Sequence, residues 1–108
     1  MNLPTEIFGD VIVVHTPEEL GADQCEAFEA YLPTLDRRNI VLDLDNTETL
    51  DSRGVTSLCN VQERLSEAQG DVKIATSNAT NRKIFEITRL DQQLEVFNSV
   101  IEAVKSFQ

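Results

Sequence analysis

Three short apolar runs, each rich in β-branched residues, set the framework of this 108-residue chain. Runs of this kind are typical of buried β-strands, and they are "VIVV" at 11–14, "NIVLDLD" at 39–45 and "DVKIAT" at 71–76. A fourth run, "LEVF" at 94–97, predicts a short last strand. "TEIF" at 5–8 predicts an N-terminal strand that turns at Gly9-Asp10 and pairs antiparallel with 11–14.

The stretches after the first two long runs have helical spacing. The first helix is expected to start at Asp23, where Glu26 three residues later would complete a capping box. Thr16-Pro17 offers an alternative start one turn or more earlier. The second helix is expected over 52–69, with Gly70 as its stop.

Two further helices are expected in the last third of the chain. Asn78 or Asn81 can cap a helix that ends near Leu90, and Ser99 with Glu102 predicts a capping box for the final one. The apolar positions expected on the inner faces of the four helices are Cys25, Phe28, Leu32, Leu35, Val55, Leu58, Val61, Leu65, Ala68, Ile84, Phe85, Ile87, Val100, Ile101, Val104 and Phe107.

Strands that alternate with helices predict an α/β fold with a mixed, mainly parallel sheet and right-handed crossovers. We expect four to five strands flanked by about four helices. The length is that of one core, so residues 1–108 are expected to form a single domain.

The formal charge of −10 narrows the classes of partner. An acidic surface repels phosphate backbones and anionic lipid, so neither nucleic acid nor a membrane is expected as a partner, while a basic protein would suit. The N-terminus lacks the basic and apolar regions of a signal peptide. Cys25 and Cys59 are far apart, which favours reduced thiols and a cytoplasmic location.

One candidate catalytic pair stands out. Asp43 and Asp45 end a predicted strand, where a phosphatase of the haloacid dehalogenase type places its nucleophile and its acid/base around a magnesium ion. Thr76 and Ser77 end the next strand, as a phosphate-binding hydroxyl would. No lysine and no further strand-end acidic pair at the required place completes such a site, so solvated loop carboxylates are the simpler interpretation. His15 has no partner at metal or triad spacing and is interpreted as a strand-end residue.

From Val11 to Ser106 the sequence resembles STAS domains of the anti-sigma factor antagonist family. The resemblance rests on "NIVLDLDNTETLDSRGVTSL", on "VQERLSEAQGDVKIATSN" and on "NRKIFEITRLDQQLEVFNSVIEAV", in that order and spacing. It implies a sheet flanked by helices, no catalytic machinery, no cofactor and no metal. It further implies partner switching with an anti-sigma factor that is also a serine kinase.

The resemblance also implies where the partner binds. Family members are phosphorylated on a Ser or Thr directly before a glycine at the start of the second helix, and here Arg53 occupies that acceptor position before Gly54. Ser52 lies one residue earlier, where a helix N-terminus would tolerate a phosphate. The expected partner-binding residues are Asp51, Ser52, Arg53, Gly54 and Gln62. A STAS scaffold or ligand-binding module outside a sigma factor circuit remains an alternative, as does a phosphatase using Asp43 and Asp45.

Overall fold

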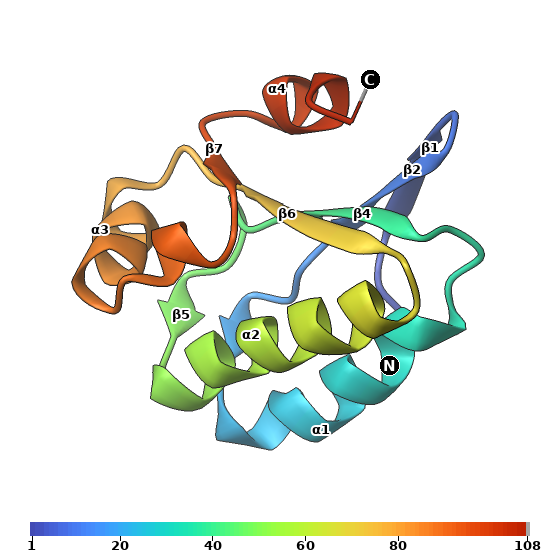
Figure 1. The fold of residues 1–108 in the computed structure, drawn as a ribbon. Coiled ribbons are helices and arrows are strands. Elements are labelled where there is room, and N and C mark those ends of the chain that lie inside the picture. Colours follow the sequence, from blue (N-terminus) through green and yellow to red (C-terminus); the bar gives the residue numbers. More distant parts are fainter. Residues whose placement is uncertain (108) are drawn as a thin grey trace.

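The computed structural model describes residues 1–107 and contains a five-stranded sheet in the order β1-β2-β4-β6-β7 (Figure 1). The strands are β1 (Thr5–Phe8), β2 (Val11–His15), β4 (Asn39–Asp43), β6 (Asp71–Ala75) and β7 (Val96–Phe97). β1 pairs antiparallel with β2, and the other neighbours pair in parallel. This arrangement confirms the predicted mainly parallel sheet and the antiparallel N-terminal hairpin.

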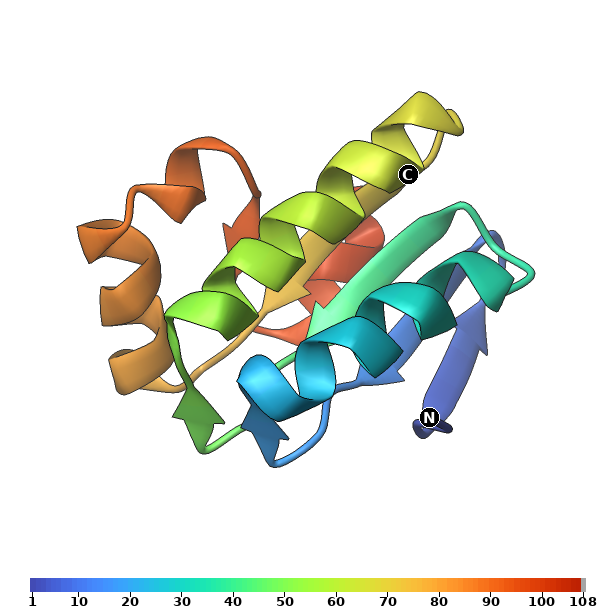
Figure 2. The same cartoon turned by 90° about the horizontal axis from the view of Figure 1, so that it is seen from below.

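Four α-helices flank the sheet and confirm the α/β class. They are α1 (Ala22–Tyr31), α2 (Ser52–Glu67), α3 (Ala79–Ile87) and α4 (Val100–Lys105), and the short 3-10 helices η1 (Leu32–Thr34) and η2 (Leu90–Gln92) follow α1 and α3. α1 and α2 lie side by side on one face of the sheet, α4 lies on the opposite face, and α3 lies beyond one end (Figures 1 and 2).

Alternation along the strands divides the core in two. On β2, Ile12 and Val14 belong to the larger cluster, which includes Leu58 of α2, while Val11 and Val13 belong to a smaller cluster under α4. Buried residues on both faces are expected of a strand inside a mainly parallel sheet. The sheet therefore holds α2 against its more heavily packed side.

The start of α1 differs from both predictions. The helix begins at Ala22, and the side chain of Gln24 accepts a hydrogen bond from the backbone N–H of Gly21 at 3.0 Å, so neither Asp23 with Glu26 nor Thr16 marks the start. The Thr16 region leads instead into β3 (Glu19–Leu20), which pairs in parallel with β5 (Thr49–Leu50). Two-residue strands carry too little periodicity to be predicted from sequence.

Four apolar positions lie outside the predicted inner faces. Ala68, Ile87 and Ile101 are exposed, and Leu35 is half-buried just after η1 rather than on α1. Ala68 and Ile87 lie at the C-terminal ends of α2 and α3. α4 packs on the sheet through Val100, Ala103 and Val104, which leaves Ile101 on another side of the helix.

The two predicted C-terminal stops also differ in detail. α3 ends at Ile87, before Leu90. Beyond α2 the left-handed residue is Gln69, with φ 65°, and not Gly70. A Cβ on Gly70 would lie 2.5 Å from the carbonyl oxygen of Arg38, so Gly70 is required for close packing rather than for a left-handed turn. The predicted caps at Asn78 and Ser99 are confirmed.

Candidate functional site

The start of α2 is held by a cap and by a close backbone contact. Asp51 is the N-cap, and its Oδ1 accepts a hydrogen bond from the backbone N–H of Gly54 at 2.9 Å. Gly54 is buried, and a Cβ there would lie 2.0 Å from the carbonyl oxygen of Leu20. The space at Gly54 is therefore filled by β3 of the same chain, and Gly54 supports the corner from beneath rather than facing a partner.

Two exposed residues form the outer surface of this corner. Ser52 and Arg53 are the first two residues of α2, and within residues 1–107 neither side chain makes a hydrogen bond or an ion pair. Arg53 lies along a groove between α1 and α2 that is also lined by Glu26 and Glu29. We refer to Asp51–Gly54 as the α2 corner; it presents one free hydroxyl and one free cation next to two carboxylates.

One of the two carboxylates in the groove beside Arg53 already has partners within the domain. Glu29 accepts a hydrogen bond from Ser57 Oγ at 3.1 Å and lies 3.9 Å from Arg64 Nη2. Glu26 is exposed. A partner that approaches Arg53 therefore meets Glu26 as the less engaged carboxylate of the groove.

Gln62 lies apart from the α2 corner. It is ten residues further along the helix than Ser52, which corresponds to about 15 Å at the helical rise. Its side-chain amide bonds to the start of β6, because Oε1 accepts from the backbone N–H of Val72 at 3.2 Å and Nε2 donates to Asp71 Oδ1 at 3.4 Å. The structure therefore brings Asp51, Ser52, Arg53 and Gly54 together but gives Gln62 an internal partner.

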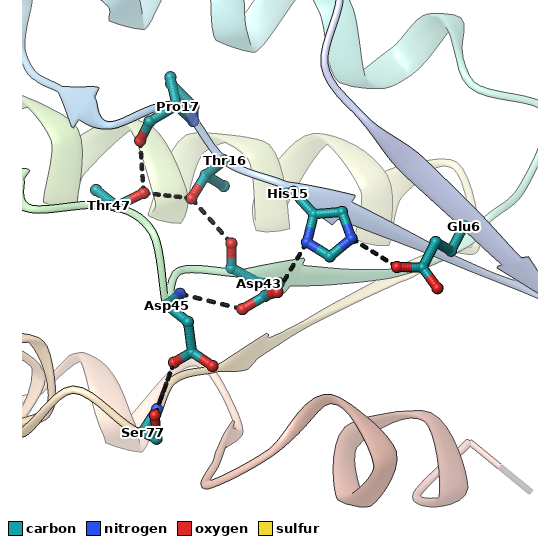
Figure 3. Close-up of polar contacts among 8 residues, drawn as sticks. All are labelled: Glu6, His15, Thr16, Pro17, Asp43, Asp45, Thr47 and Ser77. Carbon is teal, nitrogen blue, oxygen red and sulfur yellow. Dashed lines mark hydrogen bonds and ion pairs between the residues drawn. The ribbon is translucent and has the colours of Figure 1, made fainter.

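The carboxylates of Asp43 and Asp45 point toward different partners (Figure 3). Asp43 is buried; its Oδ2 is 2.8 Å from His15 Nδ1, and its Oδ1 accepts from the backbone N–H of Asp45 at 3.0 Å. Asp45 Oδ1 accepts from the backbone N–H of Ser77 at 2.7 Å and from its hydroxyl at 3.1 Å. Within residues 1–107 no three His, Cys, Asp or Glu side chains are grouped to hold a metal ion. The pair does not form the shared magnesium site that the phosphatase hypothesis requires.

His15 has partners that its sequence position did not suggest. In the parallel register of β2 and β4, His15 lies beside Asp43, and its second ring nitrogen, Nε2, is 2.9 Å from Glu6 Oε1. His15 is the last residue of β2, as interpreted from the sequence, and the structure adds two side-chain partners to it. The signal that could have found the contact is register, since His15 and Asp43 both occupy the last position of adjacent parallel strands.

The loop between β4 and β5 is fixed by buried hydroxyl and amide groups. Thr16 Oγ1 donates to the carbonyl of Asp43 at 3.1 Å and also contacts Thr47 Oγ1, which donates to the carbonyl of Pro17 at 2.6 Å. Asn81 Nδ2 donates to the carbonyl of Thr47 at 3.1 Å. Thr47 is fully buried, so it is not accessible as a modification site. The same hydrogen bonds fix the loop that leads through β5 into α2.

A sequence model of a known family, described as "Mlab, STAS domain", matches residues 5–101. The chain belongs to the STAS domain family. A curated protein of Thermotoga neapolitana, provisionally named an anti-sigma factor antagonist, is 23% identical over 97% of this chain and 96% of that protein. A similarly named protein of Thermotoga maritima is 22% identical over 94% of each chain. The resemblance described from the sequence is thereby confirmed.

Solved structures share the fold of this STAS domain. A crystal structure of an anti-sigma factor antagonist from Mycobacterium paratuberculosis has a TM-score of 0.85 at 20% identity, covering 97% of this chain and 92% of that chain. The phosphorylated Bacillus protein SpoIIAA has a TM-score of 0.71 at 19% identity, covering 99% of this chain and 100% of that chain. In residues 1–107 no helix has the length and apolar character needed to span a bilayer.

Proposed function

We propose that this STAS domain is a non-catalytic interaction module of the anti-sigma factor antagonist type. It acts in the cytoplasm and binds an anti-sigma factor that is also a serine kinase, without a cofactor of its own. The family membership and the names of the relatives support this class. The charge of −10 supports a basic binding surface on the partner.

The observation that carries the proposal is the contrast within the α2 corner between a rigid base and a free surface. Asp51 and buried Gly54 hold the backbone, while Ser52 and Arg53 are exposed and have no side-chain partner within residues 1–107. Since folding already orders the backbone of this corner, a partner that binds Ser52 and Arg53 has to order only their side chains.

Isothermal titration calorimetry against the source organism's anti-sigma factor kinase tests whether the α2 corner binds the partner. We expect Ser52→Asp to weaken binding by about 1–3 kcal/mol, because it places a carboxylate in the interface. Thermal unfolding should be unchanged, since a carboxylate at a helix N-terminus is compatible with the helix dipole. Arg53→Ala should also weaken binding if Arg53 is a fixed contact.

Ser66→Ala is the matched control, because Ser66 is exposed on the same helix away from the α2 corner. It should bind like the wild type. Association should also slow as salt concentration rises, because an acidic domain meets a basic partner. Wild-type affinity in both Ser52→Asp and Arg53→Ala would move the interface elsewhere on the domain.

The proposal includes an altered phosphorylation site. Arg53 stands where the family resemblance puts the acceptor hydroxyl, so the wild type should be phosphorylated poorly or not at all by such a kinase. Arg53→Ser should create an acceptor next to buried Gly54. Mass spectrometry after incubation with kinase and ATP measures this, and efficient transfer to Ser52 in the wild type would show that the acceptor register differs here.

A second candidate is a STAS scaffold or ligand-binding module outside a sigma factor circuit. It is favoured by the likeness to the murine anion transporter Slc26a9, which has a TM-score of 0.73 at 16% identity and matches 92% of this chain but only 18% of the transporter. The same fold is therefore used inside a protein of another kind. Calorimetry with the anti-sigma factor kinase separates the two candidates, because only the first requires an interaction.

A further inference from the structure

The ring of His15 lies between two carboxylates that come from the strands on either side of β2 (Figure 3). Nδ1 is 2.8 Å from Asp43 Oδ2 of β4, and Nε2 is 2.9 Å from Glu6 Oε1 of β1. Ionised carboxylates only accept hydrogen bonds, so both contacts are made together only when both ring nitrogens carry a proton. The geometry is therefore that of an imidazolium cation.

We propose that His15 is a proton-dependent clamp that fastens the edge strand β1 to the rest of the sheet. With the proton in place, one ring joins β1, β2 and β4. A neutral ring has a single N–H and can keep only one carboxylate, and its bare nitrogen then faces the other. The Asp43 side chain is 10% exposed and that of Glu6 is 57% exposed, so Glu6, which water can solvate, is the contact that is released.

β1 is the element that would respond. It has a neighbouring strand on one side only, and all four of its residues are exposed. Edge strands with few buried contacts open locally at low free-energy cost. Losing the Glu6 contact therefore weakens the attachment of β1, a strand whose four residues are all exposed.

The charges around the ring set the direction of the effect. Burial by itself lowers the pKa of His15, but hydrogen bonds with Glu6 and Asp43, together with the attraction of both carboxylates, outweigh burial and raise the pKa above 6.5. α4 packs on the same side of the sheet, and its charged residues Glu102 and Lys105 are exposed and do not hydrogen-bond the ring.

The sign of the linkage follows from this shift. Since the pKa is higher in the folded state, the clamp is complete below the unfolded pKa of 6.5 and is lost as pH rises through the folded pKa. We therefore expect β1 to open more often on the alkaline side of that pKa.

His15 is the only histidine, so a single ring signal reports its protonation by NMR. In the wild type that signal should titrate above pH 6.5. Hydrogen exchange, corrected for intrinsic rates, should show the protection of hydrogen-bonded β1 amides falling about three- to tenfold through the same midpoint, the range expected for the net contribution of one typical hydrogen bond. Amides of β6, an interior strand two places away from β2, serve as the internal reference.

Glu6→Gln should lower the ring pKa and remove the pH step in β1, while Glu67→Gln, an exposed charge change on α2, should leave both unchanged. His15→Gln should also remove the pH-dependent change in β1 protection. This second variant tests the clamp independently if Glu6→Gln alters the β1–β2 hairpin itself. A ring pKa at or below 6.5, or the same β1 step in Glu6→Gln as in the wild type, would overturn the clamp.

Discussion

The polar side chains at the start of α2 and that of Gln62 in its second half are in opposite situations. At the start, Ser52 and Arg53 are exposed and lack side-chain partners within residues 1–107. In the second half, Gln62 is tied to Asp71 and Val72 at the start of β6. Polar residues on one amphipathic helix can therefore be free to bind a partner protein, or can hydrogen-bond another part of the same domain. The neighbouring element determines which of the two occurs.

The two ends are alike in how the backbone is anchored. Each has a glycine that lies against a carbonyl of another element: a Cβ would meet Leu20 O at 2.0 Å from Gly54 and Arg38 O at 2.5 Å from Gly70. Both ends are thus fixed by close backbone contact, although Ser52 and Arg53 at the start lack the side-chain partners that Gln62 has. This makes the helix a convenient place to separate stability from binding.

The largest effect is expected between the two ends, at Leu58, which is fully buried. Leu58→Ala should lower the free energy of unfolding by about 2–5 kcal/mol, from lost burial and a residual cavity. Urea unfolding followed by circular dichroism measures it. Ser52→Ala, at the exposed start of the helix, should stay within about 0.5 kcal/mol of the wild type. Similar values for the two variants would contradict the burial of this helix face.

The next largest effect is expected at Gly54. In an exposed helix, replacing glycine by alanine stabilises by roughly 0.5–1 kcal/mol. Here the added Cβ would lie 2.0 Å from Leu20 O, so we expect Gly54→Ala to destabilise by about 1–3 kcal/mol instead. Ser66→Ala on the same helix is the control. The sign of the change in the free energy of unfolding, measured by urea unfolding, distinguishes the two cases. A stabilised Gly54→Ala variant would mean that α2 and β3 are not in close backbone contact at Gly54.

Much of the fold could be predicted because its elements have strong periodicity. The buried runs at β2, β4 and β6 and the apolar spacing of α2 are long enough to outweigh local ambiguity. The paired two-residue strands β3 and β5 could not be predicted, since their partners are 30 residues apart and the pairing depends on the finished sheet. Ile101 is exposed because α4 packs on the sheet through Val100, Ala103 and Val104, and residue type alone did not show which apolar side chains of this helix face the sheet.

The site was predictable only where the evidence is local. The start of α2 at Ser52 follows from helix-start signals, although the residue that caps it is Asp51. The role of Gly54 under β3 and the pairing of His15 with Asp43 follow from tertiary contacts and register, which residue types alone do not encode. Gln62 shows the same limit: a half-buried polar residue on a helix gives no sign of which neighbour it bonds.

The smallest effect is expected at Gln62, and it tests the comparison most directly. Gln62→Ala removes one of the two acceptors of the Val72 N–H, which also donates to Asp71 Oδ1 at 2.9 Å, and it removes a donor to Asp71. The free energy of unfolding should therefore fall by about 0.5–1.5 kcal/mol, the net worth of such hydrogen bonds. Affinity for the proposed partner, an anti-sigma factor kinase, should stay at the wild-type value, unlike that of Arg53→Ala. Glu63→Ala is the matched control, since Glu63 is the exposed neighbour on the same turn.

Unfolding and calorimetry on the same variants separate the possibilities at Gln62. A loss of stability with unchanged affinity assigns Gln62 to the junction between α2 and β6. Unchanged stability with weakened affinity would instead return Gln62 to the partner surface and extend that surface along the whole helix. The two ends of α2 would then no longer differ in kind, because the same exposed face would serve the partner from Ser52 to Gln62.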